Sequence, residues 1–303
     1  MKVIRGIRPD LLPASVVTLG MFDGVHRGHQ ALLQTCRTQA AQVHLPAVAL
    51  TYEPHPSVIL RPDHPIALLT TMPEKLEHLA RWGMDVVVIP EFTLEFSQLP
   101  ADRFLHEVLV AALHPQVVVA GYRTTFGHAR EGTAAVLRDA GVALGFAVDI
   151  VEPIEVAGGP VSSTRIRQAL EAGEIALATE LLGYRYQLSG LVTHGDGRGH
   201  QIGVPTANLT TPPEKLIPAD GVYAVEASAP GVTRRAVMNI GKRPTFNRPY
   251  SLEVHLLDYH ADLYGQPLTV TFLARLRETR PFDSQESLLA QIRADIALAR
   301  AIV

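Results

Sequence analysis

Apolar residues in the first part of the chain form short β-branched runs that are separated by longer amphipathic stretches. The runs are typical of strands buried on both faces, and the stretches have the apolar spacing of helices. The predicted strands cover residues 16–19, 47–52, 86–89 and 117–120. The predicted helices cover residues 28–43, 74–82, 101–113 and 133–140. Strands that alternate with helices predict an α/β domain built on a parallel sheet.

The pattern changes after Tyr186, where strand-like runs follow one another without helices between them. These runs cover residues 188–193, 222–227, 236–240, 251–257 and 268–274. Strands joined by turns rich in glycine, proline and aspartate predict an antiparallel barrel or sandwich. A helix over residues 284–300 follows, because leucine and isoleucine recur there at helical spacing. We therefore expect an α/β domain over residues 1–185 and an all-β domain over residues 186–303.

The composition narrows the class of protein. A length of 303 residues fits two domains, and 47% hydrophobic residues are enough to form their cores. The 27 basic and 30 acidic side chains nearly balance, so the charge does not favour a protein that binds nucleic acid or a membrane surface. We see no targeting segment and no apolar run of membrane-spanning length. The single cysteine, Cys36, excludes an intramolecular disulfide framework and agrees with a cytoplasmic location.

A polar cluster lies between the first predicted strand and helix, where residues 20–29 read Gly-Met-Phe-Asp-Gly-Val-His-Arg-Gly-His. Gly20 lets a nucleotide approach the backbone at the end of the strand. Gly28 and His29 begin the helix, whose N–H groups and dipole favour phosphate. His26 and His29 are three residues apart and share a helix face. Two imidazoles there can stabilise charge in nucleotidyl transfer, whereas a structural loop or a zinc pair is the alternative.

This segment resembles the signature of the nucleotidyltransferase superfamily, and its full length is similar to that of prokaryotic FAD synthetases. Glu-Pro-His-Pro at residues 53–56 and Val-Ser-Ser-Thr-Arg-Ile-Arg at residues 161–167 extend the resemblance. It implies that Ser163 and Thr164 donate hydrogen bonds to ATP phosphates and that Arg167 adds a charged fork. Without the resemblance, the Ser-Ser-Thr triplet is a helix N-cap, and both roles can coexist. The resemblance also implies catalytic roles for the two histidines and nucleotide binding by neighbouring loop residues, namely Gly20, Phe22, Asp23, Gly24 and Gly28.

A second cluster begins the later domain, where four glycines between Gly195 and Gly203 precede Pro-Thr-Ala-Asn at residues 205–208. The glycine loop lacks the spacing and the lysine of a Walker A site, and a plain turn between strands is the alternative. Thr206 and Asn208 are two residues apart, so in an extended segment they point to the same side. Their hydroxyl and amide oxygens are hard ligands that suit Mg²⁺ bound to nucleotide phosphates.

The second cluster resembles the riboflavin kinase domain, as do Asn-Ile-Gly at residues 239–241 and Glu-Val-His at residues 253–255. The resemblance implies that Gly195 and Gly203 contact the nucleotide and that Glu253 is the general base for the riboflavin 5′-hydroxyl. The sequence alone favours a surface-facing carboxylate at that position. For two arginines the resemblance implies a contact with flavin or a role in closing the site, and a solvated salt-bridge face is the alternative. These arginines are Arg277 and Arg280.

The resemblance covers nearly the whole chain. It implies a Rossmann-like nucleotidyltransferase domain followed by a β-barrel riboflavin kinase domain. A bifunctional enzyme of this kind phosphorylates riboflavin to FMN and adenylylates FMN to FAD, with ATP and Mg²⁺. Small molecules are the expected partners, and the sequence does not indicate an oligomeric state.

Two alternatives stay open. Met21 replaces the family's usual asparagine, and Arg123 replaces a usual acidic residue, which favours a kinase with a weakened adenylyltransferase domain. A flavin-binding regulator without turnover is the other alternative, and the intact Glu253 and Thr206 argue against it. Of the 13 histidines, only His26 and His29 have a chemical role in this interpretation, so we do not expect a histidine metal centre.

Overall fold

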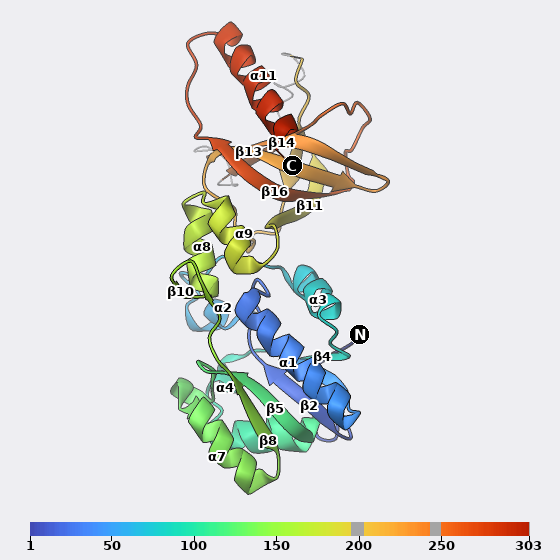
Figure 1. Cartoon of the computed structure of the whole chain (residues 1–303), viewed down its shortest axis with the longest axis vertical. Coiled ribbons are helices and arrows are strands. Elements are labelled where there is room, and N and C mark those ends of the chain that lie inside the picture. The colour runs from blue at the N-terminus through green and yellow to red at the C-terminus, as the bar shows by residue number, and fades with distance from the viewer. Residues whose placement is uncertain (195–202, 243–249, 303) are drawn as a thin grey trace. The chain divides into compact units, whose positions relative to one another are not determined.

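A computed structural model describes residues 1–194, 203–242 and 250–302 of the chain. It divides into two compact units, Met1–Ser163 and Thr164–Val303 (Figure 1). The first unit is an α/β domain and the second contains a closed β-barrel, so the predicted fold classes of both halves are confirmed. The boundary expected at 185/186 follows the change from helices to strands, and it stays a prediction.

The first unit is built on a six-stranded parallel sheet with strand order β1-β4-β3-β2-β5-β8. Its strands are β1 (Lys2–Arg5), β2 (Ser15–Leu19), β3 (Ala47–Leu50), β4 (Val86–Ile89), β5 (Pro115–Gly121) and β8 (Ala147–Val151). Every residue of β2, β3 and β4 is buried, as their apolar runs require. The strand order reverses at β2, and open α/β sheets bind ligands at the carboxyl ends of the strands beside such a reversal.

Helices cover both faces of this sheet. They are α1 (Arg27–Val43), α2 (Pro56–Leu60), α3 (Met72–Arg81), α4 (Leu94–Ser97), α5 (Ala101–Arg103), α6 (Ala111–Leu113) and α7 (Ala134–Leu144). One apolar core contains Leu33 of α1 and Leu79 of α3, and the other contains Leu137 of α7. The helix predicted over residues 101–113 is present, but its central part is the π-helix η1 (Phe104–Val110).

Several short elements of the first unit have no counterpart among the predicted ones, as do β1, β8, α2 and α4. They are β6 (Thr125–Phe126), η2 (His128–Arg130), β7 (Gly132–Thr133), β9 (Glu155–Val156) and β10 (Gly159–Pro160). Two-residue strands carry too few side chains to show an alternating pattern, so the sequence gives no signal for them.

The second unit begins with α8 (Ser163–Glu171) and α9 (Ile175–Leu182), which precede the barrel. The barrel order is β11-β12-β15-β14-β13-β16, closed by pairing of β11 with β16. Its strands are β11 (Gln187–Thr193), β12 (Ala207–Thr210), β13 (Gly221–Ala229), β14 (Val232–Lys242), β15 (Tyr250–Leu256) and β16 (Pro267–Arg277). The closing helix α11 (Gln285–Ala301) contacts β13, β14 and β16 (Figure 1). Of the two alternatives, barrel or sandwich, the structure shows a closed barrel. The strand β12 was not among the predicted strands.

Candidate active sites

The loop between β2 and α1 is fixed by buried polar contacts. Asp23 is 2% exposed, and its carboxylate accepts hydrogen bonds from the N–H groups of Leu69 and Thr70 at 3.0 and 3.1 Å. The Gly24 N–H donates to Thr70 Oγ1 at 3.0 Å, and Gly24 has a φ of 81°, which favours glycine. The Asp23 carboxylate therefore ties the loop to the segment before α3.

Two stacked imidazoles lie at the N-terminus of α1. His26 is the N-cap, and its Nδ1 accepts the N–H of His29 at 3.4 Å. The two rings are 3.7 Å apart between centroids and nearly parallel, and the ring of Phe22 meets His29 edge-on at 5.3 Å. A Cβ on Gly28 would lie 3.3 Å from the His26 ring, so glycine leaves room for the stack. The predicted shared face of the two histidines is thus present.

His29 is poised as a neutral imidazole. Burial lowers its pKa well below the usual 6.5, and the charges of His26 and Lys75 lower it further. Its Nδ1 is buried and has no hydrogen-bond partner within the described part of the chain. A buried polar atom without a partner is costly, so this nitrogen is available to a group that enters the site.

Lys75 places a buried cation near the same loop, and sequence reasoning missed it. This residue of α3 is 5% exposed, and burial lowers its pKa although Asp23 and Glu53 act to raise it. The helix begins with a capping box, in which Thr71 N–H donates to Glu74 Oε2 at 2.9 Å. Lys75 and Leu79 form its buried face, so a lysine on an apolar stripe was the available signal.

Ser163, in the segment at residues 161–167, contacts this loop. The Ser163 hydroxyl donates to the Asp23 carbonyl at 2.9 Å, and α8 begins at Ser163. Thr164 and Arg167 belong to the second compact unit, so their phosphate contacts stay predictions. Arg123 is exposed in the turn after β5.

His55 has a structural role at the start of α2. It caps α2, with Nδ1 accepting the N–H of Ser57 at 3.1 Å. Gly20 packs against the ring of Phe22, where an added Cβ would lie 3.4 Å from the ring. These contacts shape the loop, and the predicted nucleotide contacts of Gly20, Phe22, Gly24 and Gly28 stay predictions.

A cavity of about 570 Å³ lies between the barrel and α11. Thr206, Asn239, Glu253 and His255 line it on the barrel side, together with Arg277 of β16. Strand register explains this grouping. In the barrel Glu253 pairs directly with Asn239 on one side and with Asn208 on the other, so these three side chains lie on one face of the sheet.

The carboxylate of Glu253 is half-buried at the wall of this cavity. Its Oε1 accepts a hydrogen bond from the Ser251 hydroxyl at 2.8 Å. The neighbouring Leu252 and Val254 are buried on the opposite face of β15, as strand alternation requires. Glu253 therefore lies on the outer face of the barrel, partly exposed, at the wall of a cavity that residues of α11 also line.

His255 also lines the cavity, and sequence reasoning gave it no role. Its ring Nδ1 is 2.8 Å from the carbonyl oxygen of Pro205. A carbonyl only accepts, so Nδ1 carries the proton in this contact. The signal was the spacing of two from Glu253, which places both side chains on one face of a strand.

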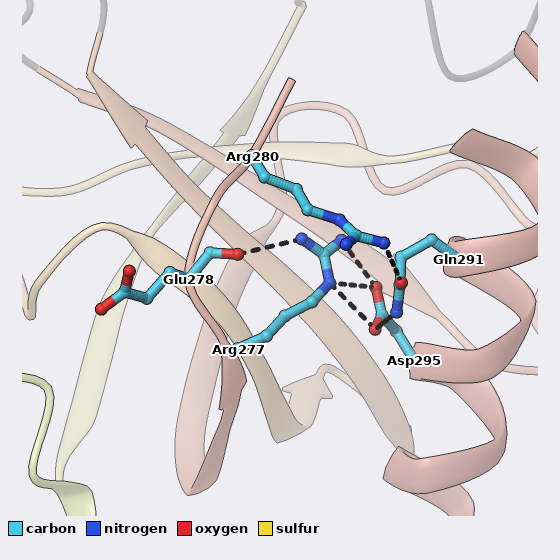
Figure 2. Close-up of polar contacts among 5 residues, drawn as sticks. All are labelled: Arg277, Glu278, Arg280, Gln291 and Asp295. Atoms are coloured by element: carbon cyan, nitrogen blue, oxygen red, sulfur yellow. Dashed lines mark hydrogen bonds and ion pairs between the residues drawn. The ribbon is translucent and has the colours of Figure 1, made fainter. Parts of the chain in front are cut away.

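Arg277 holds α11 against the barrel (Figure 2). Its Nε lies 3.1 Å from both carboxylate oxygens of Asp295, and its Nη2 lies 2.8 Å from Oδ2. The Asp295 side chain is 3% exposed. Gln291 links the second arginine, because it donates to Asp295 at 2.9 Å and accepts from Arg280 at 2.7 Å. Both arginines line the cavity, and Arg277 makes an ion pair in which its own side chain is 20% exposed.

Other predicted features fall as follows. Gly195 lies outside the described residues, and Gly203 is described, with a φ of 76°. Among the described residues, no group of three or more His, Cys, Asp or Glu side chains is arranged to hold a metal ion. None of the helices in the described ranges is both long and apolar enough to cross a membrane.

Comparison with known protein families gives two matches that together span most of the chain. A model described as FAD synthetase matches residues 9–165, and one described as riboflavin kinase matches residues 182–303. The bifunctional riboflavin kinase/FMN adenylyltransferase of Escherichia coli K12 is 40% identical over 306 residues, covering 99% of this chain and 97% of its own. The chain belongs to the bifunctional riboflavin kinase/FMN adenylyltransferase family.

Other members of the family agree with this assignment. The enzyme of the same name from Bacillus subtilis is 36% identical and covers 93% of this chain and 90% of its own. A solved structure from Streptococcus pneumoniae, described as a macrolide-efflux protein, is 34% identical with a TM-score of 0.92 and covers 100% of both chains. Efflux is a description of that protein alone, and we use the likeness for the shared fold.

Proposed function

We propose that the two sites carry the two reactions of the family in one chain. In the barrel, the γ-phosphoryl group of ATP passes to the riboflavin 5′-hydroxyl, giving FMN and ADP. In the α/β unit, AMP passes from a second ATP to FMN, giving FAD and pyrophosphate. The observation that carries the proposal is the half-buried carboxylate of Glu253 in a cavity large enough for a small molecule, beside Thr206 and the partner strand's Asn208.

For the kinase reaction, Glu253 acts as the general base. Its carboxylate accepts the proton of the 5′-hydroxyl while the oxygen attacks the γ-phosphorus, and the hydrogen bond from Ser251 holds it in place. Arg277 and Arg280 form the cavity wall toward α11, where they close the site around the flavin. The guanidinium of Arg277 is already paired with Asp295. It therefore contributes to the shape of the cavity and to its electric field more than it contributes hydrogen bonds to the flavin.

Oxygen donors in this site fit Mg²⁺. Thr206 supplies a hydroxyl and Asn208 an amide oxygen, both on the side of the barrel that carries Glu253. These two residues would hold the ion with the nucleotide phosphates, and Mg²⁺ would neutralise polyphosphate charge. Gly195 and Gly203 belong to the loop that we propose to contact the nucleotide.

For the adenylyl transfer, His26 and His29 face the reacting phosphate at the N-terminus of α1. The helix N–H groups and the imidazoles donate to charge that develops on the α-phosphate and on departing pyrophosphate. Ser163, Thr164 and Arg167 bind the remaining phosphates, and Gly20, Phe22, Asp23, Gly24 and Gly28 shape the loop that admits the nucleotide. Asp23 contributes by fixing the loop, because backbone N–H groups occupy its carboxylate.

The decisive experiment compares two variants in two assays. Glu253→Gln should abolish riboflavin phosphorylation and leave FMN adenylylation unchanged, and His29→Ala should do the reverse. Each reaction thereby serves as the folding control for the other. Equal loss of both activities in both variants would contradict two separate sites.

The same assays decide between the alternatives. No FAD above the His29→Ala background would favour a monofunctional kinase with a weakened adenylyltransferase domain, and riboflavin phosphorylation would exclude a regulator without turnover. We further propose a cytoplasmic location, and the domain boundary at 185/186. The lone, buried Cys36 supports the location. The change from helices to strands after α9 supports the boundary, and the riboflavin kinase match begins close to it, at residue 182.

A further inference from the structure

His255 connects the wall of the kinase cavity to the segment just before β12. The strand β12 begins at Ala207, which pairs with Val254, so Pro205 and Thr206 lie beyond the ladder. Proline has no N–H to donate, and its carbonyl is the group that can be held. The hydrogen bond from His255 Nδ1 to that carbonyl, at 2.8 Å, takes the place of the next backbone hydrogen bond between β12 and β15.

This bond fixes more than one atom. The Pro205 carbonyl and the Thr206 nitrogen belong to one planar peptide group, so holding the oxygen orients the plane from which Thr206 departs. The Thr206 side chain lines the same cavity as Glu253, which lies on the adjacent strand β15. Two residues of β15 thus contribute to the site in different ways. Glu253 faces the cavity, and His255 holds the segment that carries Thr206.

We propose that His255 is a positioning residue for riboflavin phosphorylation, which orients Thr206 by donating its Nδ1 proton to the Pro205 carbonyl. The inference rests on the proposed kinase function of this cavity. The contact with a carbonyl oxygen requires a proton on Nδ1, so this nitrogen is the donor that the proposal needs. His255 acts through Thr206, so its loss lowers activity without removing a group from the reaction.

The test uses two variants at one position and one elsewhere. His255→Asn keeps an amide N–H near the place of Nδ1, and His255→Leu keeps the bulk without a donor. His260→Leu is the matched control, because His260 is exposed on the same unit. We expect His255→Leu to lose about tenfold in kcat/KM for riboflavin phosphorylation, the loss of about one good hydrogen bond. His255→Asn should recover most of it, and His260→Leu should match the wild type.

Two readouts separate positioning from other causes. Affinity for MgADP, measured by calorimetry without riboflavin, should fall in His255→Leu and recover in His255→Asn, and FMN adenylylation should be unchanged in all three variants. In ¹⁵N-histidine spectra of the wild type, the signal absent from His255→Leu should show a protonated Nδ1.

The failures are distinguishable. A wild type that does not phosphorylate riboflavin would contradict the proposed function itself. Wild-type activity that persists in His255→Leu with unchanged MgADP affinity would overturn the inference alone. An equal loss in His255→Asn and His255→Leu would also overturn it, since the donor would then not be what matters.

Discussion

The ion pair between Arg277 and Asp295 should stabilise the barrel unit far more than an exposed pair of the same length. Both this pair and that of Arg300 with Asp258 have a closest contact of 2.8 Å. The side chains of Asp258 and Arg300 are 69% and 54% exposed, whereas those of Asp295 and Arg277 are 3% and 20% exposed. Asp295→Asn and Asp258→Asn therefore form a matched comparison in which burial is the main difference.

The magnitude follows from what each substitution leaves behind. Asp295→Asn removes the charge that accepts three contacts from Arg277 and one from Gln291. Breaking a buried pair costs about 3–5 kcal/mol because a charge is left without compensation. Arg277 keeps some contact with water, so we expect the lower end, about 3 kcal/mol. Asp258→Asn should cost less than about 1 kcal/mol.

Denaturation in urea can assign the loss to one unit. The only tryptophan, Trp82, lies in the first unit, so its fluorescence follows that unit, whereas far-ultraviolet circular dichroism follows both. Asp295→Asn should move the dichroism transition to lower urea and leave the fluorescence transition in place. Riboflavin KM should rise as well, because α11 forms one wall of the cavity. Equal shifts for the two variants would refute the argument that burial sets the value of the pair.

Three further predictions concern Cys36, His29 and Gly190. Burial raises the pKa of the Cys36 thiol to about 12, so iodoacetamide at about pH 8 should leave the native protein unmodified and label it once urea is added; labelling of the native chain at the rate of the unfolded one would contradict this. The folded-state pKa of His29 lies well below the usual 6.5. As the pH falls through about 6.5, this residue therefore takes up a proton in the unfolded chain but not in the folded chain. The free energy of unfolding drops as a result. That drop, measured by urea denaturation between about pH 7.5 and about pH 5.5, should be smaller in His29→Gln, and an unchanged drop would show that His29 does not cause it. A Cβ on Gly190 would lie 2.1 Å from the Thr210 carbonyl oxygen, so Gly190→Ala should cost about 3 kcal/mol of barrel stability by dichroism, whereas Gly241→Ala, with its nearest neighbour at 3.8 Å, should cost little; equal costs would refute the steric argument.

The sequence predicted the main strands and helices because their patterns are local. Apolar runs such as that of β4 need a sheet covered on both faces, and a run of this kind reads the same in any context. The strand β12 was not predicted because Ala-Asn-Leu-Thr is short and half polar. The π-helix η1 was not predicted because its residues have the apolar content of an ordinary helix. The wider turn of a π-helix depends on packing.

The site was predictable where motifs carry the chemistry and not where tertiary contacts do. Glycines and histidines at fixed spacing marked the loop between β2 and α1, and Glu253 and Thr206 marked the kinase cavity. Lys75 and Asp295 lie in no motif, and the Glu-Val-His motif gave His255 no role, because each of the three acquires its contacts from a partner on another element. Asp295 did leave a trace in the sequence, since it lies three residues after Ile292 on the apolar stripe of α11.

The placement of the cavity between the barrel and α11 has a consequence for how this unit can change over time. Strand alternation assigns Glu253 and His255 to the cavity and their neighbours Leu252 and Val254 to the buried core. Substitutions at these cavity positions can therefore alter activity while the apolar interior, and with it the closure of the barrel, stays intact. Selection on activity and selection on foldability act on interleaved but separate residues of the same strand.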